Sequence, residues 1–138
     1  MIPGEWMDHN DLSNRSAPVI LFDFDSIVCT KVTRRFGRYK YELNPQVVAA
    51  LGNLFRRDFT VVFVTFKWPD KKIDELEQEL DRWGCNYSYV MKVKDLDDFY
   101  RWLQRNDGMF YSRDREVIKR LFPSAVEWHD YLIQAWSK

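Results

Sequence analysis

Two aspartates stand one residue apart at the end of an apolar run, in the segment PVILFDFDSIVCT of residues 18–30. If residues 19–22 form a buried strand, a spacing of two places the side chains of Asp23 and Asp25 on the same side of the chain. Like charges this close repel each other, so the pair persists if a cation binds or if one carboxyl keeps its proton. The pattern therefore predicts magnesium binding or general-acid chemistry. A strand that ends in polar residues, with Asp25 capping a turn, is the structural alternative.

Further residues suited to phosphate chemistry follow the other apolar runs. Thr65 ends the run VVFVT and would offer a hydroxyl and a free backbone N–H. Lys92 and Lys94 follow a third run, where an ammonium group would neutralise a phosphate. Asp114 follows a fourth run, although an aspartate there is also a good N-cap for the helix REVIKRLF. Each residue alone has an ordinary structural explanation, but their shared position after successive strands favours one phosphate site.

The elements that must position these residues begin with short, unbroken apolar strands. The runs at 19–22 and 61–65 are typical of central parallel strands that are buried on both faces. Three further strands are expected near 87–91, 109–112 and 125–128.

Helical patterns separate these strands. The segment NPQVVAALGNLF has Asn44 as its N-cap and Pro45 at its first helical position. In DKKIDELEQELDRWG, Asp70 is the expected N-cap and Gly84 the expected end. The apolar stripe of that helix consists of Ile73, Leu76, Leu80 and Trp83. The remaining helices are expected at about 95–105, over REVIKRLF, and over the final HDYLIQAW.

The alternation of strand and helix predicts one α/β domain. It would be a three-layer, Rossmann-like arrangement, with a parallel sheet of about five strands and helices on both faces. Residues 1–16 show no hydrophobic period and are expected to form a flexible arm, with the folded domain over 17–138. The segment between Asp25 and Asn44 is too short for an inserted cap domain, so we expect an open site without a cap.

Composition argues against several other classes of protein. The net charge of zero provides no global field to recruit nucleic acid, so any such attraction must be local. No apolar run approaches the roughly 20 residues that span a bilayer, and the first residues lack a secretory signal pattern. Cys29 and Cys85 are isolated, which disfavours zinc and disulfide frameworks, so a cytoplasmic location is expected. The five glycines form neither GxGxxG nor a P-loop.

The segment CTKVTRRFGRYKYELN, which follows the two aspartates, is basic and aromatic. It contains Arg34, Arg35 and Arg38, and Gly37 near its middle predicts a hairpin flap. Basic side chains interleaved with aromatic rings beside a phosphate site would hold a nucleic-acid end by phosphate pairing and base stacking. An edge hairpin whose charges simply face water is the alternative.

The order of these motifs resembles that of the haloacid dehalogenase-like phosphohydrolase superfamily, over roughly residues 18–130. The segment VILFDFDSIV, a strand ending in threonine, a lysine and an acidic strand end follow one another as the four motifs of that superfamily do. The resemblance implies a fold, a Mg²⁺ cofactor and a phospho-aspartate mechanism. It assigns the nucleophile to Asp23, the general acid/base to Asp25, phosphate binding to Thr65 and Lys94 (or Lys92), and metal binding to Asp23, Asp25 and Asp114.

Within that superfamily, two segments resemble the 3′-phosphatase domain of phage-type polynucleotide kinases. These are LNPQVVAAL and YSRDREVIKRLFPSAVEW. Capless phosphatases of sugar and capsule metabolism are also similar, including a tryptophan–glycine pair like Trp83–Gly84. The expected function is Mg²⁺-dependent hydrolysis of a phosphomonoester, on a nucleic-acid 3′-phosphate end or a nucleotide. A capless sugar-phosphate phosphatase is the second possibility.

Arg113 departs from the pattern of the superfamily. It stands where the first of two final aspartates is expected, whereas Ser26 and Ile27 in place of Gly-Thr are a milder change. A guanidinium there repels Mg²⁺ unless it points away or binds phosphate itself. A protein of another class therefore stays open: a binding or regulatory protein that keeps the fold and is catalytically impaired.

Overall fold

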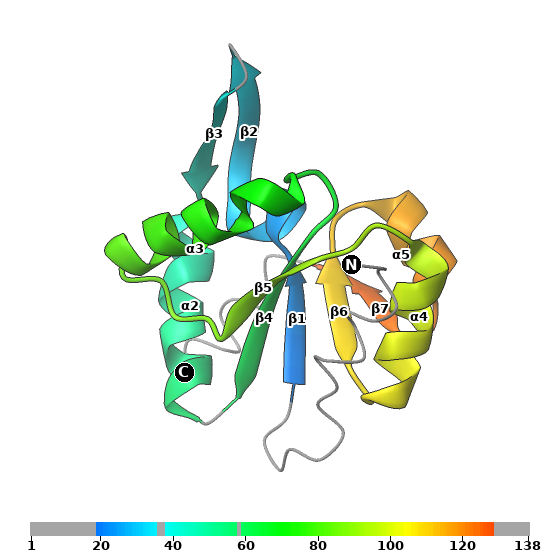
Figure 1. Cartoon of the computed structure of the whole chain (residues 1–138). Coiled ribbons are helices and arrows are strands. Elements are labelled where there is room, and N and C mark those ends of the chain that lie inside the picture. The colour runs from blue at the N-terminus through cyan, green and yellow to red at the C-terminus, as the bar shows by residue number, and fades with distance from the viewer. Residues whose placement is uncertain (1–18, 36–37, 58, 129–138) are drawn as a thin grey trace.

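A parallel five-stranded sheet is the centre of the computed structural model, which describes residues 19–35, 38–57 and 59–128, without the side chains of 30–41 and 55 (Figure 1). In spatial order the strands are β5 (Tyr89–Lys92), β4 (Thr60–Thr65), β1 (Val19–Asp23), β6 (Met109–Ser112) and β7 (Ala125–Glu127). The predicted parallel sheet is confirmed, although the strand expected near 87–91 begins only at Tyr89.

The sheet order makes β1 the central strand. The chain adds β4 and β5 on one side of β1, then returns to add β6 and β7 on the other side. In open α/β sheets, ligands bind beyond the carboxyl ends of the strands at such a reversal of strand order. The end of β1, where Asp23 lies, is therefore the expected place for a site.

Helices cover both faces of the sheet, which confirms the three-layer arrangement (Figure 1). On one face lie α2 (Pro45–Arg56) and α3 (Ile73–Arg82), and on the other lie α4 (Leu96–Arg105) and α5 (Arg115–Leu121). The predicted start of α2 is confirmed, because the Asn44 side chain accepts hydrogen bonds from the backbone N–H groups of Gln46 and Val47.

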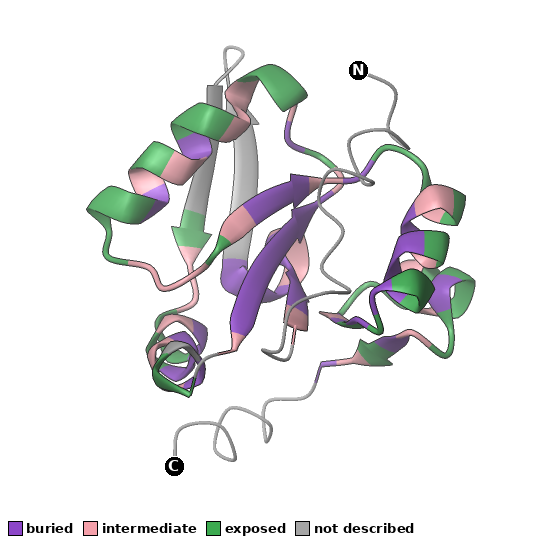
Figure 2. Cartoon of the chain, turned by 60° about the horizontal axis from the view of Figure 1, so that its bottom comes forward, coloured by how far each residue is buried: buried purple, intermediate pink, exposed green. Residues whose placement is uncertain are grey.

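The core consists of two hydrophobic clusters, one on each face of the sheet. Alternate residues of β1 serve the two clusters, since Phe22 packs with α2 and α3 while Leu21 packs with α4 and α5. Every residue of β4 is buried, as its unbroken apolar sequence requires, and each helix turns its apolar side inward (Figure 2). Trp102 on α4 is the largest fully buried side chain among the described residues.

Two details of the α3 prediction are wrong. Trp83 does not extend the apolar stripe, because it follows the last helical residue and is 64% exposed. Asp70 does not cap α3, because a single 3₁₀ turn, η2 (Asp70–Lys72), precedes the helix and Asp70 forms an ion pair with Lys94 instead. The predicted end at Gly84 is confirmed by its φ of 74°, a left-handed conformation that glycine adopts without strain.

A two-stranded antiparallel hairpin projects from the sheet domain (Figure 1). It consists of β2 (Cys29–Arg35) and β3 (Arg38–Leu43), and it follows a short π-helical turn, η1 (Phe24–Val28), that leaves β1 directly. The predicted hairpin is confirmed as a backbone structure. The side chains of Arg34, Arg35 and Arg38 lie outside the described ones, as do the expected arm over 1–16 and the expected helix in HDYLIQAW.

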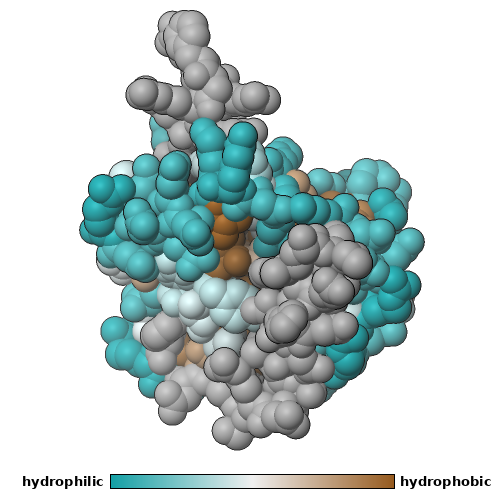
Figure 3. Space-filling model, in the orientation of Figure 1, coloured by the Kyte–Doolittle hydropathy of each residue, from teal (hydrophilic) through white to brown (hydrophobic). Residues whose placement is uncertain are grey.

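The described residues include no inserted domain other than this hairpin. None of their helices is both long and apolar enough to cross a membrane. The face shown in Figure 3 is mainly hydrophilic over the helices, with small hydrophobic areas near its centre and toward its edges.

Candidate active site

Asp23 ends β1, and its side chain is only 2% exposed. The hydroxyl of Ser112, at the end of β6, donates a hydrogen bond of 2.7 Å to Asp23 Oδ2. The backbone N–H of Asp25 donates to Asp23 Oδ1 at 3.2 Å. Burial raises the pKa of Asp23 to about 6, with a smaller contribution from the nearby charge of Asp25 and a partial offset from the Ser112 bond.

The carboxylate of Asp25 faces the loop after β4. It accepts hydrogen bonds from the Thr65 hydroxyl at 3.0 Å and from the backbone N–H groups of Phe66 and Lys67 at 3.1 and 3.4 Å. The backbone N–H of Trp68 donates to Thr65 Oγ1 at 3.2 Å, which fixes that hydroxyl in place. Burial raises the pKa of Asp25, and the bond from the Phe66 N–H is the largest opposing effect.

The two carboxylates thus find their partners on opposite sides of β1. The prediction that a spacing of two on one strand aligns them is wrong in its reasoning, because β1 ends at Asp23 and Asp25 lies in the π-helical turn η1. The turn leaves Asp23 bonded to Ser112 of β6, while Asp25 bonds to Thr65 of β4. The pair remains coupled, since the charge of Asp25 raises the pKa of Asp23.

The structure distinguishes the two candidate lysines. The Lys92 ammonium donates a 2.7 Å hydrogen bond to the carbonyl of Phe66, the residue whose N–H holds Asp25. Burial lowers the pKa of Lys92, while the charges of Asp70 and Asp25 act in the opposite direction, so this ammonium lies within the field of Asp25. Lys94 instead forms a half-exposed ion pair with Asp70. Of the two candidates, Lys92 is therefore the one beside the loop that follows Thr65 (residues 66–69, the Thr65 loop).

Asp114 is the N-cap of α5 in the structure. Its Oδ1 accepts hydrogen bonds from the N–H groups of Glu116 and Val117 at 3.1 and 3.4 Å. The backbone N–H of Arg113 donates to the Ser26 hydroxyl at 3.2 Å. Within the described ranges, no group of three or more His, Cys, Asp or Glu residues could hold a metal ion. The structure does not bring Asp114 together with the aspartate pair, and its metal-binding role stays a prediction.

Asp23 and Asp25 by themselves suit Mg²⁺ in donor type. This ion is commonly bound through one or two carboxylates, with water and substrate phosphate oxygens as its other ligands. Two coupled carboxylates whose pKa values are raised by burial form a site in which a cation would be favourable. The donor set therefore fits the ion that the sequence predicts.

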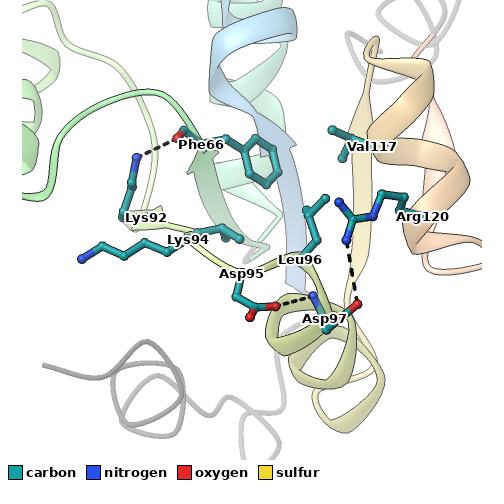
Figure 4. Close-up of a pocket in the computed structure, with 9 residues that line it drawn as sticks. Phe66, Lys92, Lys94, Asp95, Leu96, Asp97, Val117 and Arg120 are labelled. Atoms are coloured by element: carbon teal, nitrogen blue, oxygen red, sulfur yellow. Dashed lines mark hydrogen bonds and ion pairs between the residues drawn. The ribbon is translucent and has the colours of Figure 1, made fainter.

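A pocket of about 660 Å³ adjoins the Thr65 loop (Figure 4). Phe66 and Lys92 line this pocket, and the same two residues lie beside Asp25. Its walls come from the loop after β4, from the end of β5 through the start of α4, and from α5: Phe66, Lys92, Val93, Lys94, Asp95, Leu96, Asp97, Val117 and Arg120. Its volume is in the range of small-molecule pockets.

Ser112 is the site residue that the sequence motifs did not indicate. It is fully buried, and its hydroxyl bonds to Asp23. The signal available in the sequence is its position at the end of the strand MFYS, since strands that flank a central one end beside it.

Comparison with solved structures places this arrangement among known folds. A Streptomyces avermitilis protein described as an HAD (haloacid dehalogenase-like) family hydrolase matches at 12% identity, with a TM-score of 0.58. The match covers 90% of this chain and 80% of that one. The 3-deoxy-D-manno-octulosonate 8-phosphate phosphatase of Yersinia pestis matches at 13% identity over 91% of this chain and 71% of its own, with a TM-score of 0.54. The chain has the fold of these hydrolases.

The same phosphatase from Moraxella catarrhalis, solved with magnesium, phosphate and a KDO molecule, matches at 11% identity. The match covers 85% of this chain and 65% of that one, with a TM-score of 0.54. No protein-family model matches the sequence, and a search of curated proteins gives no match. The similarity therefore establishes the fold, while the resemblance to polynucleotide 3′-phosphatases stays a prediction.

The raised pKa of Asp23 predicts a pH-dependent stability. The folded protein holds this proton more tightly than the unfolded chain, so the contribution of Asp23 is most favourable below about pH 4 and is lost as the pH rises through about 6. Without metal, Asp23→Asn should therefore be more stable than the wild type at pH 8, by at most about 3 kcal/mol, and similar to it near pH 4. Urea denaturation in EDTA across this pH range measures the difference.

The matched control is Asp74→Asn, which makes the same chemical change at an exposed position on α3. Its effect on the free energy of unfolding should stay within about 0.5 kcal/mol throughout. An Asp23→Asn variant that is less stable than the wild type at pH 8 would show that burial does not penalise this charge.

Proposed function

We propose that this chain is a Mg²⁺-dependent phosphomonoester hydrolase that works through a phospho-aspartate. The observation that carries the proposal is the carboxylate of Asp23, buried at the end of the central strand and coupled to Asp25. A buried carboxylate is costly to fold, yet this one is kept and is held by hydrogen bonds from Ser112 and the Asp25 N–H. A costly group that the fold retains in this way is typical of a functional site. The fold shared with HAD hydrolases supports the same assignment by analogy.

The proposed reaction has two displacement steps. In the first, an oxygen of Asp23 attacks phosphorus in line, the bond to the leaving oxygen breaks, and protonated Asp25 supplies a proton to that oxygen. In the second, water attacks the same phosphorus while the Asp25 carboxylate takes its proton, and the bond between phosphorus and Asp23 breaks. Inorganic phosphate and an alcohol are the products, and both aspartates return to their starting states.

Thr65 and Lys92 are the proposed phosphate-binding side chains. The Thr65 hydroxyl and the N–H groups of Phe66 and Lys67 hold the Asp25 carboxylate in the free protein. A substrate phosphate would compete for these donors, so its binding would release Asp25 toward the leaving oxygen. Mg²⁺ bound by Asp23 and Asp25, with Asp114 as a further predicted ligand, would supply positive charge for the phosphate oxygens.

Two substrate classes have support from different observations. The basic hairpin beside η1 favours a nucleic-acid 3′-phosphate end or a nucleotide, with Arg34, Arg35 and Arg38 as the proposed substrate-binding residues. The second candidate, a sugar phosphate, is favoured by the similarity to octulosonate 8-phosphate phosphatases and by the pocket of about 660 Å³.

The proposed nucleophile is tested by Asp23→Asn. Because an amide does not attack phosphorus, the substitution should lower kcat for phenyl phosphate by at least about 10³-fold, and EDTA should abolish wild-type turnover until Mg²⁺ is added back. Acid quenching of the wild type should trap a phosphorylated protein that the variant lacks. Asp74→Asn is the control, with turnover like that of the wild type.

Near-normal turnover by Asp23→Asn would exclude Asp23 as the nucleophile. Absence of turnover by the wild type with Mg²⁺, on a panel of phosphorylated oligonucleotides, nucleotides and sugar phosphates, would support the impaired binding protein that Arg113 leaves open.

The two lysines give a matched pair of variants. Lys92→Ala should lower kcat/KM by about 10²-fold, because it removes an ammonium that is hydrogen-bonded to the Phe66 carbonyl in the loop after β4, whereas Lys94→Ala should change it by less than about threefold. Steady-state kinetics with phenyl phosphate and saturating Mg²⁺ make the comparison. The reverse order of effects would return the phosphate-binding role to Lys94.

Substitutions in the hairpin test which of the two substrate classes the protein uses. Replacing Arg34, Arg35 and Arg38 by alanine should raise KM for a 3′-phosphorylated oligonucleotide about tenfold and flatten its salt dependence, because fewer counterions are released. KM for phenyl phosphate should hardly change. Equal losses on both substrates would make the hairpin structural, and a higher kcat/KM for sugar phosphates than for oligonucleotides would favour the second candidate.

A further inference from the structure

The end of β6 carries a buried hydroxyl that faces the proposed nucleophile. Ser112 is fully buried, and its Oγ lies 2.7 Å from Asp23 Oδ2. The pairing of β1 with β6, with Phe22 opposite Tyr111, places the next residue of each strand side by side. This contact is therefore set by the sheet and not by a loop.

The direction of the Ser112 hydroxyl proton follows from its other contact. The backbone N–H of Asp114 donates to Ser112 Oγ at 3.0 Å and occupies one of its lone pairs. An ionised Asp23 only accepts hydrogen bonds, so the proton of Ser112 is the one shared in their 2.7 Å contact. The chain of donors runs from the start of α5 through Ser112 to Asp23.

A second serine lies behind this contact. Ser26 Oγ is 3.5 Å from Ser112 Oγ and accepts the N–H of Arg113 at 3.2 Å. The turn η1 and the β6–α5 connection are thus joined through hydroxyl groups at the point where Asp23 lies.

We propose that Ser112 is a positioning residue for the phosphoryl-transfer reaction, because its hydroxyl holds Asp23 Oδ2 and leaves Oδ1 to attack phosphorus. The inference rests on the proposed function and adds to it the choice between the two carboxylate oxygens. The bond that Oδ1 accepts from the Asp25 N–H is longer, at 3.2 Å, so this contact restrains Oδ1 less than the Ser112 hydroxyl restrains Oδ2. In-line attack needs a fixed carboxylate, and a misplacement of about 1 Å costs about 10²-fold in rate.

The role of Ser112 is tested with Ser112→Ala and Ser112→Thr in the full chain, using phenyl phosphate and Mg²⁺. The alanine variant should lower kcat by about 10- to 100-fold while KM stays within about threefold, because the proposed phosphate-binding groups are untouched. In a single turnover, formation of the phosphorylated protein should slow by the same factor as kcat. The threonine variant keeps the hydroxyl and should recover most of kcat.

Thr60→Val is the matched control, because it removes another buried hydroxyl at the opposite end of the sheet, where β4 begins. Its kcat should equal that of the wild type. Ser112→Gly also removes the hydroxyl and replaces the alanine variant in the comparison if that variant does not fold.

Three results would overturn the role of Ser112 while leaving the hydrolase intact. These are wild-type kcat without the hydroxyl, equal losses in the alanine and threonine variants, and a loss that appears in KM instead of kcat. A wild type that neither turns over phenyl phosphate nor becomes phosphorylated on Asp23 would overturn the proposed function and the role of Ser112 together.

Discussion

The negative charge of Asp23, at the buried end of the central strand, is the constraint on which the rest of the site depends. A carboxylate shielded from water is costly unless hydrogen-bond donors or a cation compensate it. Its donors include the Ser112 hydroxyl on β6 and the Asp25 N–H in the first turn of η1. Both are in reach because β1 ends at this residue and β6 ends beside it. The compensation is partial, since burial still keeps the pKa of Asp23 well above its ordinary value.

The sheet order divides the work of the site between two neighbours of β1. The strand on one side provides the serine that holds Asp23, and the loop after the strand on the other side provides the donors that hold Asp25. The π-helical turn η1 makes this division possible, because it turns Asp25 away from the direction that an extended strand would give it. Two like charges are thereby kept close enough to interact and are still held by separate sets of donors.

The similarity to solved hydrolases and phosphatases at 10–13% identity shows how little of the sequence the fold itself requires. The sheet and its two hydrophobic clusters need only apolar strands of suitable length and amphipathic helices that cover both faces. The site requires more, because side chains such as Thr65 and Lys92 act only at particular strand ends. Hence the shared fold leaves the reaction and its substrate to be argued from the site residues.

The sequence by itself determined the alternating elements, the parallel sheet, the strand-end positions of Asp23 and Thr65 and the helix-capping position of Asp114, because hydrophobic period and capping residues act locally. It did not determine which side chains meet there. Lys92 and Lys94 have the same type and nearly the same position, and only the pairing of Lys94 with Asp70 and of Lys92 with the Phe66 carbonyl separated them. The bond from Ser112 to Asp23 joins residues far apart in the chain, so it depends on the pairing of β1 with β6. The local sequence pattern determines where each strand ends. Contacts between strand ends depend on which strands are neighbours in the sheet, and that is set by the tertiary structure.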